Sequence, residues 1–150
     1  MIGIFVFKAK PEDKDYKYKH DTKQPLKLTD EELFFLTKTT TLEEGLAALN
    51  QYVVPIVLVT VGADGTYAVL NGEVMHVDVE KVQAVDTTGA GDAFMAGVLR
   101  YVHYNGLPTM QEELRKCTAF GNKLGAMAAT KAGALTALPC YDDIKHLIED

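Results

Sequence analysis

The hydrophobic pattern of the chain changes its period, and the changes predict strands. Residues 55–61 (PIVLVTV) form a continuous, mostly β-branched apolar run, which is typical of a strand buried on both faces of a parallel sheet. Residues 66–70 and 73–79 flank the pair Asn71 and Gly72, which predicts a hairpin closed by a type I′ turn. These segments predict neighbouring strands of one sheet.

Helix starts are marked by a threonine followed three residues later by a glutamate, the spacing of a capping box. The pattern occurs at residues 29–32, 41–44 and 109–112. The first two precede short apolar-faced helices, and the third precedes a long helix rich in glycine and alanine that ends near Thr130. Asp142 is placed to cap a last amphipathic helix. Strands alternating with helices indicate an α/β layered fold.

The composition fits one globular domain. Hydrophobic residues make up 47% and charged residues 24% of the 150, which favours a packed core over disorder. The longest apolar stretch, residues 53–61, is too short to cross a bilayer, and nothing resembles a secretory signal, so we expect no membrane association. The only cysteines, Cys117 and Cys140, fit a reducing compartment, and we expect a cytoplasmic protein.

Charge is distributed unevenly along the chain. The formal net charge of -6 argues against a broad nucleic-acid surface, so we expect no nucleic-acid partner. Arg100 and Arg115 are the only arginines, so a clamp of several arginines around a phosphate is excluded. Residues 2–7 (IGIFVF) predict a buried strand, and the polar, lysine-rich residues 8–25 predict an exposed loop.

One short motif suggests chemistry. In residues 88–92 (TGAGD), glycines allow a tight turn that presents backbone N–H groups, and a predicted helix to about Asn105 follows at once. Such a helix start attracts phosphate or the negative charge that develops during phosphoryl transfer. Asp92 then lies where it can accept a proton from an attacking hydroxyl. From these five residues alone, a plain glycine turn with Asp92 in a first helical turn is the competing interpretation.

The longer string favours the chemical interpretation. Residues 86–99 (DTTGAGDAFMAGVL) resemble the C-terminal signature of the ribokinase-like sugar kinases, the PfkB family, without a departure. Residues 26–37, 59–69 and 120–139 resemble the family's segments around its nucleotide lobe, and the first of them is closest to bacterial fructokinases. The resemblance covers about residues 26–148. It implies a ribokinase-like, Rossmann-like layered sheet with flanking helices, and ATP-dependent phosphoryl transfer to a sugar hydroxyl.

The resemblance also implies roles for individual residues. Asp92 corresponds to the general base, and the N–H groups of Gly89, Ala90 and Gly91 correspond to the anion hole for the transferred phosphoryl group. The positions implied for nucleotide contacts are Thr60, Gly62 and Gly65 at the ribose and phosphates and Asn122 at the adenine.

Two cation sites are implied in the same way. Glu32 matches the glutamate of the family's N-x-x-E element, which organises Mg²⁺ through water, but Thr29 stands in place of the asparagine. The same two residues have capping-box spacing, so a purely structural role stays open. Some relatives bind a monovalent cation such as K⁺; the matching positions are Asp86, Thr88, Ala128, Lys131, Gly133 and Ala137.

Family members are roughly twice as long as this chain, and their N-terminal half carries the sugar pocket and a β lid. Residues 1–25 do not resemble that half, so we expect residues 26–150 to be the ATP-side half, preceded by an unrelated or rebuilt segment. The lid and the sugar half are then absent, and an exposed sheet edge favours homo-oligomers. The implied ligands are ATP, Mg²⁺ and fructose or a related sugar. A non-catalytic nucleotide-binding module and an inactive fragment that needs the missing half remain alternatives.

Overall fold

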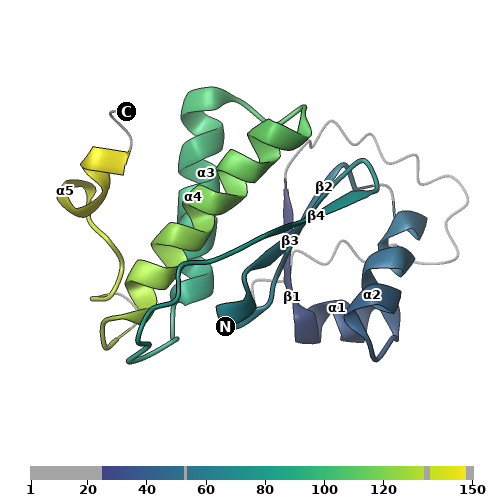
Figure 1. The fold of residues 1–150 in the computed structure, drawn as a ribbon, viewed down its shortest axis with the longest axis horizontal. Helices are drawn as coiled ribbons and strands as arrows, with labels where there is room; N and C mark the ends of the chain where they lie inside the picture. Colours follow the sequence, from purple (N-terminus) through teal and green to yellow (C-terminus); the bar gives the residue numbers. More distant parts are fainter. Residues whose placement is uncertain (1–24, 53, 134–135, 148–150) are drawn as a thin grey trace, which may run out of the picture.

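A four-stranded sheet lies between two helical layers (Figure 1). The computed structural model describes residues 25–52, 54–133 and 136–147, so the strand expected at residues 2–7 and most of the loop after it lie outside the described residues. The strands, in spatial order, are β1 (Leu26–Thr29), β2 (Ile56–Thr60), β3 (Thr66–Leu70) and β4 (Glu73–Val77). β1 and β2 are parallel, and the other two pairs are antiparallel. The α/β layered class is therefore confirmed, with a mixed sheet.

The strand pattern was largely readable from the sequence. β2 is buried along four of its five residues, as the apolar run predicts. The hairpin is confirmed, because Asn71 and Gly72 both have positive φ, 50° and 88°, as a type I′ turn requires. β4 ends at Val77, two residues earlier than predicted, and β1 was not predicted at all. With four residues, β1 exists because it pairs with β2.

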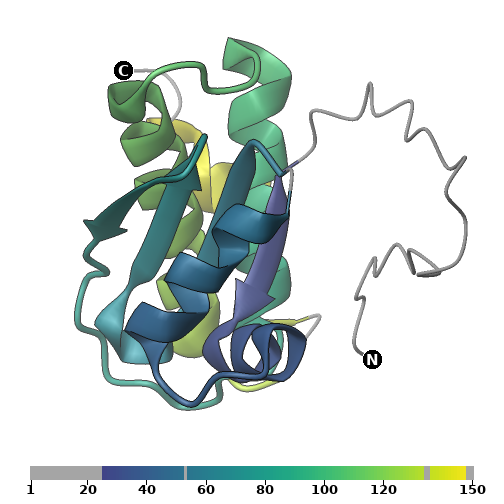
Figure 2. The ribbon, with the colours of Figure 1, turned by 90° about the vertical axis from the view of Figure 1, so that its right-hand side faces the viewer.

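Helices cover both faces of the sheet (Figure 2). One layer holds α1 (Asp30–Thr37) and α2 (Leu42–Ala48), with the 3-10 turn η1 (Leu49–Gln51). The other holds α3 (Ala90–Asn105) and α4 (Gln111–Ala129). The short α5 (Tyr141–Ile144) and η3 (Lys145–Leu147) follow α4, and η2 (Gly62–Asp64) joins β2 to β3. No helix among the described residues has the length and apolar composition needed to cross a membrane.

Alternate residues of β2 divide the core into two halves. Val57 and Val59 pack with Leu33 of α1 against the first helical layer. Ile56 and Leu58 pack against the second layer, where α3 and α4 contribute Phe94, Val98, Leu114 and Cys117. Burial raises the pKa of the Cys117 thiol to about 11, so this cysteine is a core residue, as predicted.

α3 and α4 cross closely because small residues face each other. A Cβ added at Gly97 would lie 3.0 Å from the Cα of Gly121, and one added at Gly121 would lie 2.9 Å from both Phe94 and Val98 side chains. Larger side chains at these positions would push the helices apart. The contact fixes the position of α3, and hence of the glycine turn at its start.

Two helix caps differ from prediction. At α4, Glu113 rather than Glu112 closes the helix start, and its Oε2 accepts hydrogen bonds from the amides of Thr109 and Met110 at 2.8 and 3.3 Å. At α5, Asp143 rather than Asp142 accepts the bond from the Cys140 amide, at 2.9 Å. The N-cap of α4 is Met110, one residue after the predicted Thr109, and the N-cap of α5 is Cys140, two residues before the predicted Asp142, so in each helix the adjacent carboxylate reaches the free amide.

Candidate active site

The start of α3 leaves backbone donors open. Gly89 precedes the helix with a φ of 83°, and no side chain caps it. The amide of Ala90 donates to the carbonyl of Thr87 at 3.1 Å, within the turn itself. The amides of Gly89, Gly91 and Asp92 have no acceptor in the part of the chain that the structure describes. The helix start therefore offers N–H donors and partial positive charge to an anion.

The predicted anion hole and the predicted base share this helix start. Gly89, Ala90 and Gly91 are each half-buried, while Asp92 is exposed in the first turn. The carboxylate of Asp92 makes no ion pair within 4.0 Å among the described residues, so it is accessible to a substrate hydroxyl. Since Ala90 is already engaged, the open donors on either side of it are those most available to a phosphate.

Asp86 holds the turn against the segment after α4. Its Oδ1 accepts from the Thr88 amide at 2.9 Å, and its Oδ2 accepts from the Gly133 amide at 3.1 Å. Hydrogen bonds from the side chain and amide of Thr88 and from the amide of Gly133 lower the pKa of Asp86. The carboxylate is thus a clamp between two loops that are distant in the sequence.

The clamp brings together most positions of the implied monovalent-cation site. The Ala137 amide donates to the Gly133 carbonyl at 3.0 Å, and Ala128 and Ala137 are buried in one small apolar cluster. Lys131 instead points to solvent, with its Nζ 3.9 Å from Asp143. Several of the positions implied for the cation therefore lie close together, but the binding of a cation there stays a prediction.

The predicted ribose and phosphate contacts lie where β2 ends. Thr60 is the last residue of β2, and its hydroxyl donates to the Leu28 carbonyl at 3.3 Å. Gly62 is exposed in η2, whereas Gly65 is buried, and a Cβ added there would collide with the Val77 carbonyl. β1 and β2 are parallel, so their carboxyl ends meet at one edge of the sheet, where ligands of open α/β sheets bind.

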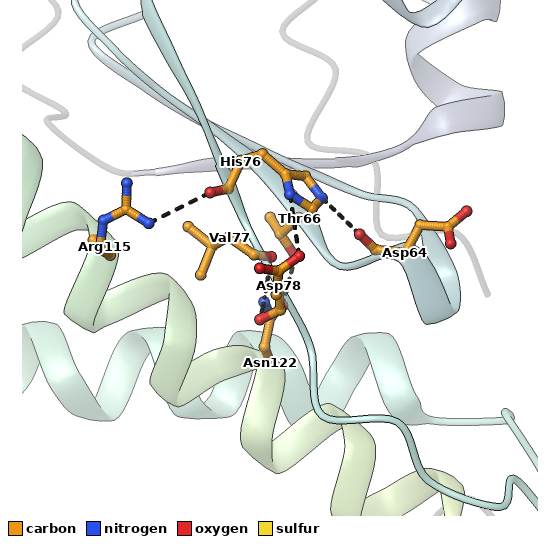
Figure 3. Close-up of polar contacts among 7 residues, drawn as sticks. All are labelled: Asp64, Thr66, His76, Val77, Asp78, Arg115 and Asn122. Carbon is orange, nitrogen blue, oxygen red and sulfur yellow. Dashed lines mark hydrogen bonds and ion pairs between the residues drawn. The ribbon is translucent and has the colours of Figure 1, made fainter.

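Asn122 connects α4 to the β3–β4 hairpin (Figure 3). Its Oδ1 accepts from the Thr66 hydroxyl at 2.6 Å, and its Nδ2 donates to the carbonyls of Val77 and Asp78, both at 3.1 Å. The side chain is only 6% exposed, so its amide hydrogens are used within the protein. A structural role is therefore established, and a contact with adenine stays a prediction.

Glu32 forms the capping box that the sequence suggested. Its Oε2 accepts from the Thr29 amide at 2.8 Å, and its own amide donates to the Thr29 hydroxyl at 3.1 Å. The described residues contain no group of three or more acidic, histidine or cysteine side chains able to hold a metal. A Mg²⁺ ion here would therefore depend on nucleotide phosphates and water, with Glu32 as the one carboxylate proposed, which is a usual arrangement for this ion.

The structure adds a residue that the sequence pattern did not indicate. Lys27 of β1 reaches the start of α3, and its Nζ would lie 3.2 Å from a Cβ added at Gly91. Because β1 was not predicted, the face on which Lys27 lies was not predicted either. A lysine between two leucines in a four-residue segment was the only available signal.

Comparison with known proteins places the chain among sugar kinases. Residues 17–140 match the family described as pfkB family carbohydrate kinase. Fructokinase from Klebsiella pneumoniae is 43% identical over 122 residues, covering 81% of this chain and 40% of the relative. Fructokinase from Escherichia coli is 38% identical over 121 residues, covering 80% of this chain and 39% of the relative.

Solved structures agree with the sequence comparison. Vibrio cholerae fructokinase, crystallised with fructose, ADP and calcium, superposes with a TM-score of 0.75 at 37% identity, covering 81% of this chain and 40% of that one. Aminoimidazole riboside kinase from Salmonella enterica, with aminoimidazole riboside and an ATP analog, has a TM-score of 0.74 at 29% identity, covering 85% and 42%. The chain thus spans about two fifths of the length of these relatives. It belongs to the pfkB family of carbohydrate kinases.

Proposed function

We propose that this chain forms the nucleotide-side half of an ATP-dependent sugar kinase of the fructokinase type. One observation carries the proposal: within the family signature, an exposed carboxylate, Asp92, lies in the first turn of a helix at whose start the amides of Gly89, Gly91 and Asp92 lack acceptors among the described residues. This is the pairing that phosphoryl transfer needs, because a base must take the hydroxyl proton while donors stabilise charge on the transferred group.

In this proposal the residues divide the work. The open amides around Gly89 and Gly91 hold the phosphoryl group, and Asp92 accepts the proton of the sugar hydroxyl. The nucleotide is flanked by four residues: Thr60, Gly62, Gly65 and Asn122. Mg²⁺, when bound, neutralises charge on the phosphates.

The acceptor is proposed to be fructose or a related sugar, since the relatives that match are named fructokinases. K⁺ is proposed for the loops around Asp86 and Gly133. β1 has no partner on its outer edge among the described residues, which supports self-association through that edge.

Titration with ATP tests the nucleotide half of the proposal. We expect the chain to bind ATP more tightly than AMP, because the open amides recognise the terminal phosphates. Calorimetry with ATP, ADP and AMP measures this preference. Equal affinity for ATP and AMP would argue against an anion hole at the start of α3.

A kinase assay tests the chemistry. Positioning of two reactants can supply about 7–11 kcal/mol, and the chain covers about 40% of the length of the Klebsiella pneumoniae fructokinase, so we expect little fructose-dependent turnover by the chain alone. A chimera in which residues 26–147 replace the matching part of the Klebsiella pneumoniae fructokinase should form fructose phosphate. Strong fructose-dependent turnover by the chain alone would mean that it builds its own acceptor pocket. An inactive but folded chimera would favour a non-catalytic nucleotide-binding module.

A further inference from the structure

Lys27 lies on the same face of the sheet as α3 and α4. In the parallel register of β1 and β2, Lys27 is opposite Leu58, which packs against α3 and α4. Its strand neighbour Leu28 packs against α1 and α2, on the other face. The same face of β2 and β3 holds the buried apolar residues Ile56, Leu58, Ala68 and Leu70, with Thr60 and Thr66 at one end of the strands, so Lys27 is a charged residue among mainly apolar neighbours.

The tip of this lysine meets the glycine turn. A Cβ built on Gly91 would lie 3.2 Å from Nζ and 3.9 Å from Cε of Lys27. A Cβ at position 91 would thus approach the ammonium group more closely than an ordinary van der Waals contact, which places the charge of Lys27 next to Gly91, whose amide is open among the described residues. Gly91 has a helical backbone without positive φ, and the nearest atoms that a Cβ there would meet belong to the Lys27 side chain.

No acidic side chain among the described residues forms an ion pair with Lys27 within 4.0 Å. Neither arginine contributes to the site, because Arg100 packs over the rings of Tyr104 and Tyr141 and Arg115 donates to the His76 carbonyl. The ammonium beside the helix start is thus a positive charge without a protein counterion among the described residues.

We infer that Lys27 binds the terminal phosphate of the nucleotide together with the amides at the start of α3. The inference rests on the proposed function and adds to it a side-chain cation contributed by a different element of the fold. A point charge with three rotatable donors suits a phosphate, and a charge-assisted contact supplements neutral amides as negative charge develops on the phosphoryl group. Because Lys27 lies on the sheet and the amides lie on α3, the phosphate would join the two layers.

The test compares nucleotide affinities of the 150-residue chain and its variants by calorimetry. Lys27→Met keeps the length and apolar stem of the side chain but removes the charge. We expect its affinity for ATP to fall about 10- to 100-fold, as for loss of a charged hydrogen-bond donor, while its affinity for AMP changes less than about twofold. Lys27→Arg should recover most of the ATP affinity. Lys116→Gln on α4 is the matched control, since it removes the same charge from an exposed position and should not change either affinity.

A second variant perturbs the contact between Lys27 and Gly91 by changing the glycine. Gly91→Ala should leave the fold intact or slightly more stable, because alanine is favoured in a helix and the atom it meets is the end of a flexible side chain. By displacing the Lys27 ammonium it should nevertheless weaken ATP binding more than AMP binding.

The outcomes separate the two proposals. If the wild-type chain prefers ATP to AMP, and Lys27→Met and Gly91→Ala show the same preference, the proposed role of Lys27 is overturned while the anion hole remains supported. Parallel losses of ATP and AMP affinity in Lys27→Met would mean that the lysine acts through the fold. An unmodified chain that does not bind ATP would overturn both proposals.

Discussion

The helices α1 and α3 begin in opposite ways. At α1, the Thr29 hydroxyl accepts from the Glu32 amide and the Glu32 carboxylate accepts from the Thr29 amide, so the two residues satisfy each other. At α3, Gly89 has no side chain to offer, and the amides that follow Ala90 stay without acceptors among the described residues. Both helices carry acidic residues in their first turn, so the acids alone do not distinguish them.

The difference separates stability from function. A helix start closed by its own side chains gains stability and cannot take a ligand without losing it. A start left open forgoes that stabilisation but keeps its donors and its partial charge for an anion. The clamp of Asp86 then holds the open turn from outside, without occupying the donors at Gly91.

The largest effect is expected from the carboxylate of the open start. In the fructokinase chimera, Asp92→Asn should lower kcat by about 10²- to 10⁴-fold, because the amide keeps the size of the side chain but cannot accept the hydroxyl proton. ATP affinity and the thermal midpoint should stay near those of the parent chimera, since Asp92 is exposed and unpaired among the described residues. Coupled assays at saturating fructose measure kcat. A variant within a factor of two of the parent would exclude Asp92 as the base.

A smaller effect is expected from the glycine at the open start. Gly89→Ala forces a side chain into a φ of 83°, which costs about 1–2 kcal/mol, and it also distorts the turn that presents the amides. Gly106→Ala is the control for strain at positive φ: Gly106 has a φ of 82° at the opposite end of the same helix with open space around it, and its ψ of 176°, against -3° at Gly89, makes a side chain there at least as unfavourable. Urea unfolding should show both variants destabilised, whereas only Gly89→Ala should lose ATP affinity. Equal ATP affinities in the two variants would place the anion elsewhere.

The sequence predicted the open helix start better than its surroundings. The glycine turn, the helix to Asn105 and the hairpin follow from local residue preferences, which do not depend on partners. β1 could not be predicted in this way, since a four-residue strand is defined by the strand it pairs with. Lys27 was missed for the same reason: the face on which it lies is fixed by pairing with β2.

The predicted caps of α4 and α5 were wrong where two acids stand side by side. Glu112 and Glu113, like Asp142 and Asp143, are equivalent as local signals, and only the exact helix start decides which carboxylate reaches the free amide. Asn122 shows the opposite case. Its contact with adenine stays a prediction, and its hydrogen bonds to Thr66 and Val77 were not predicted because they depend on the packing of α4 against the hairpin.

Substitutions at the start of α1 should change the stability of the protein but not its affinity for ATP. Thr29→Ala removes one half of the capping box and should cost about 1 kcal/mol of unfolding free energy. Thr29→Asn, which restores the asparagine of the family's element, is itself a good N-cap and should cost little. Urea unfolding measures both, and ATP titration should show neither variant changed in the absence of Mg²⁺. If Thr29→Ala weakened metal-free ATP binding as strongly as Gly89→Ala, the division between a structural and a functional helix start would be wrong.

The smallest effect is expected from the clamp that holds the open turn, and it should depend on pH. Hydrogen bonds from Thr88 and Gly133 lower the pKa of Asp86 below the value of about 3.9 that an aspartate has in an unfolded chain. The folded state therefore binds fewer protons than the unfolded state in this range, so the contribution of Asp86 to stability is present above the unfolded pKa and is lost as the pH falls through the folded one.

Asp86→Asn keeps one acceptor for Thr88 but loses the bond from Gly133, and it should lower the thermal midpoint by a few degrees at about pH 6 and by less at about pH 3. Glu113 and Asp143 also have lowered pKa values, but they are present in both proteins and cancel in the difference. Asp142→Asn, at an exposed position paired only with Lys145, is the control and should show no comparable pH dependence. A difference between wild type and Asp86→Asn that stays constant or grows on acidification would show that the Asp86 carboxylate does not hold the turn as an anion.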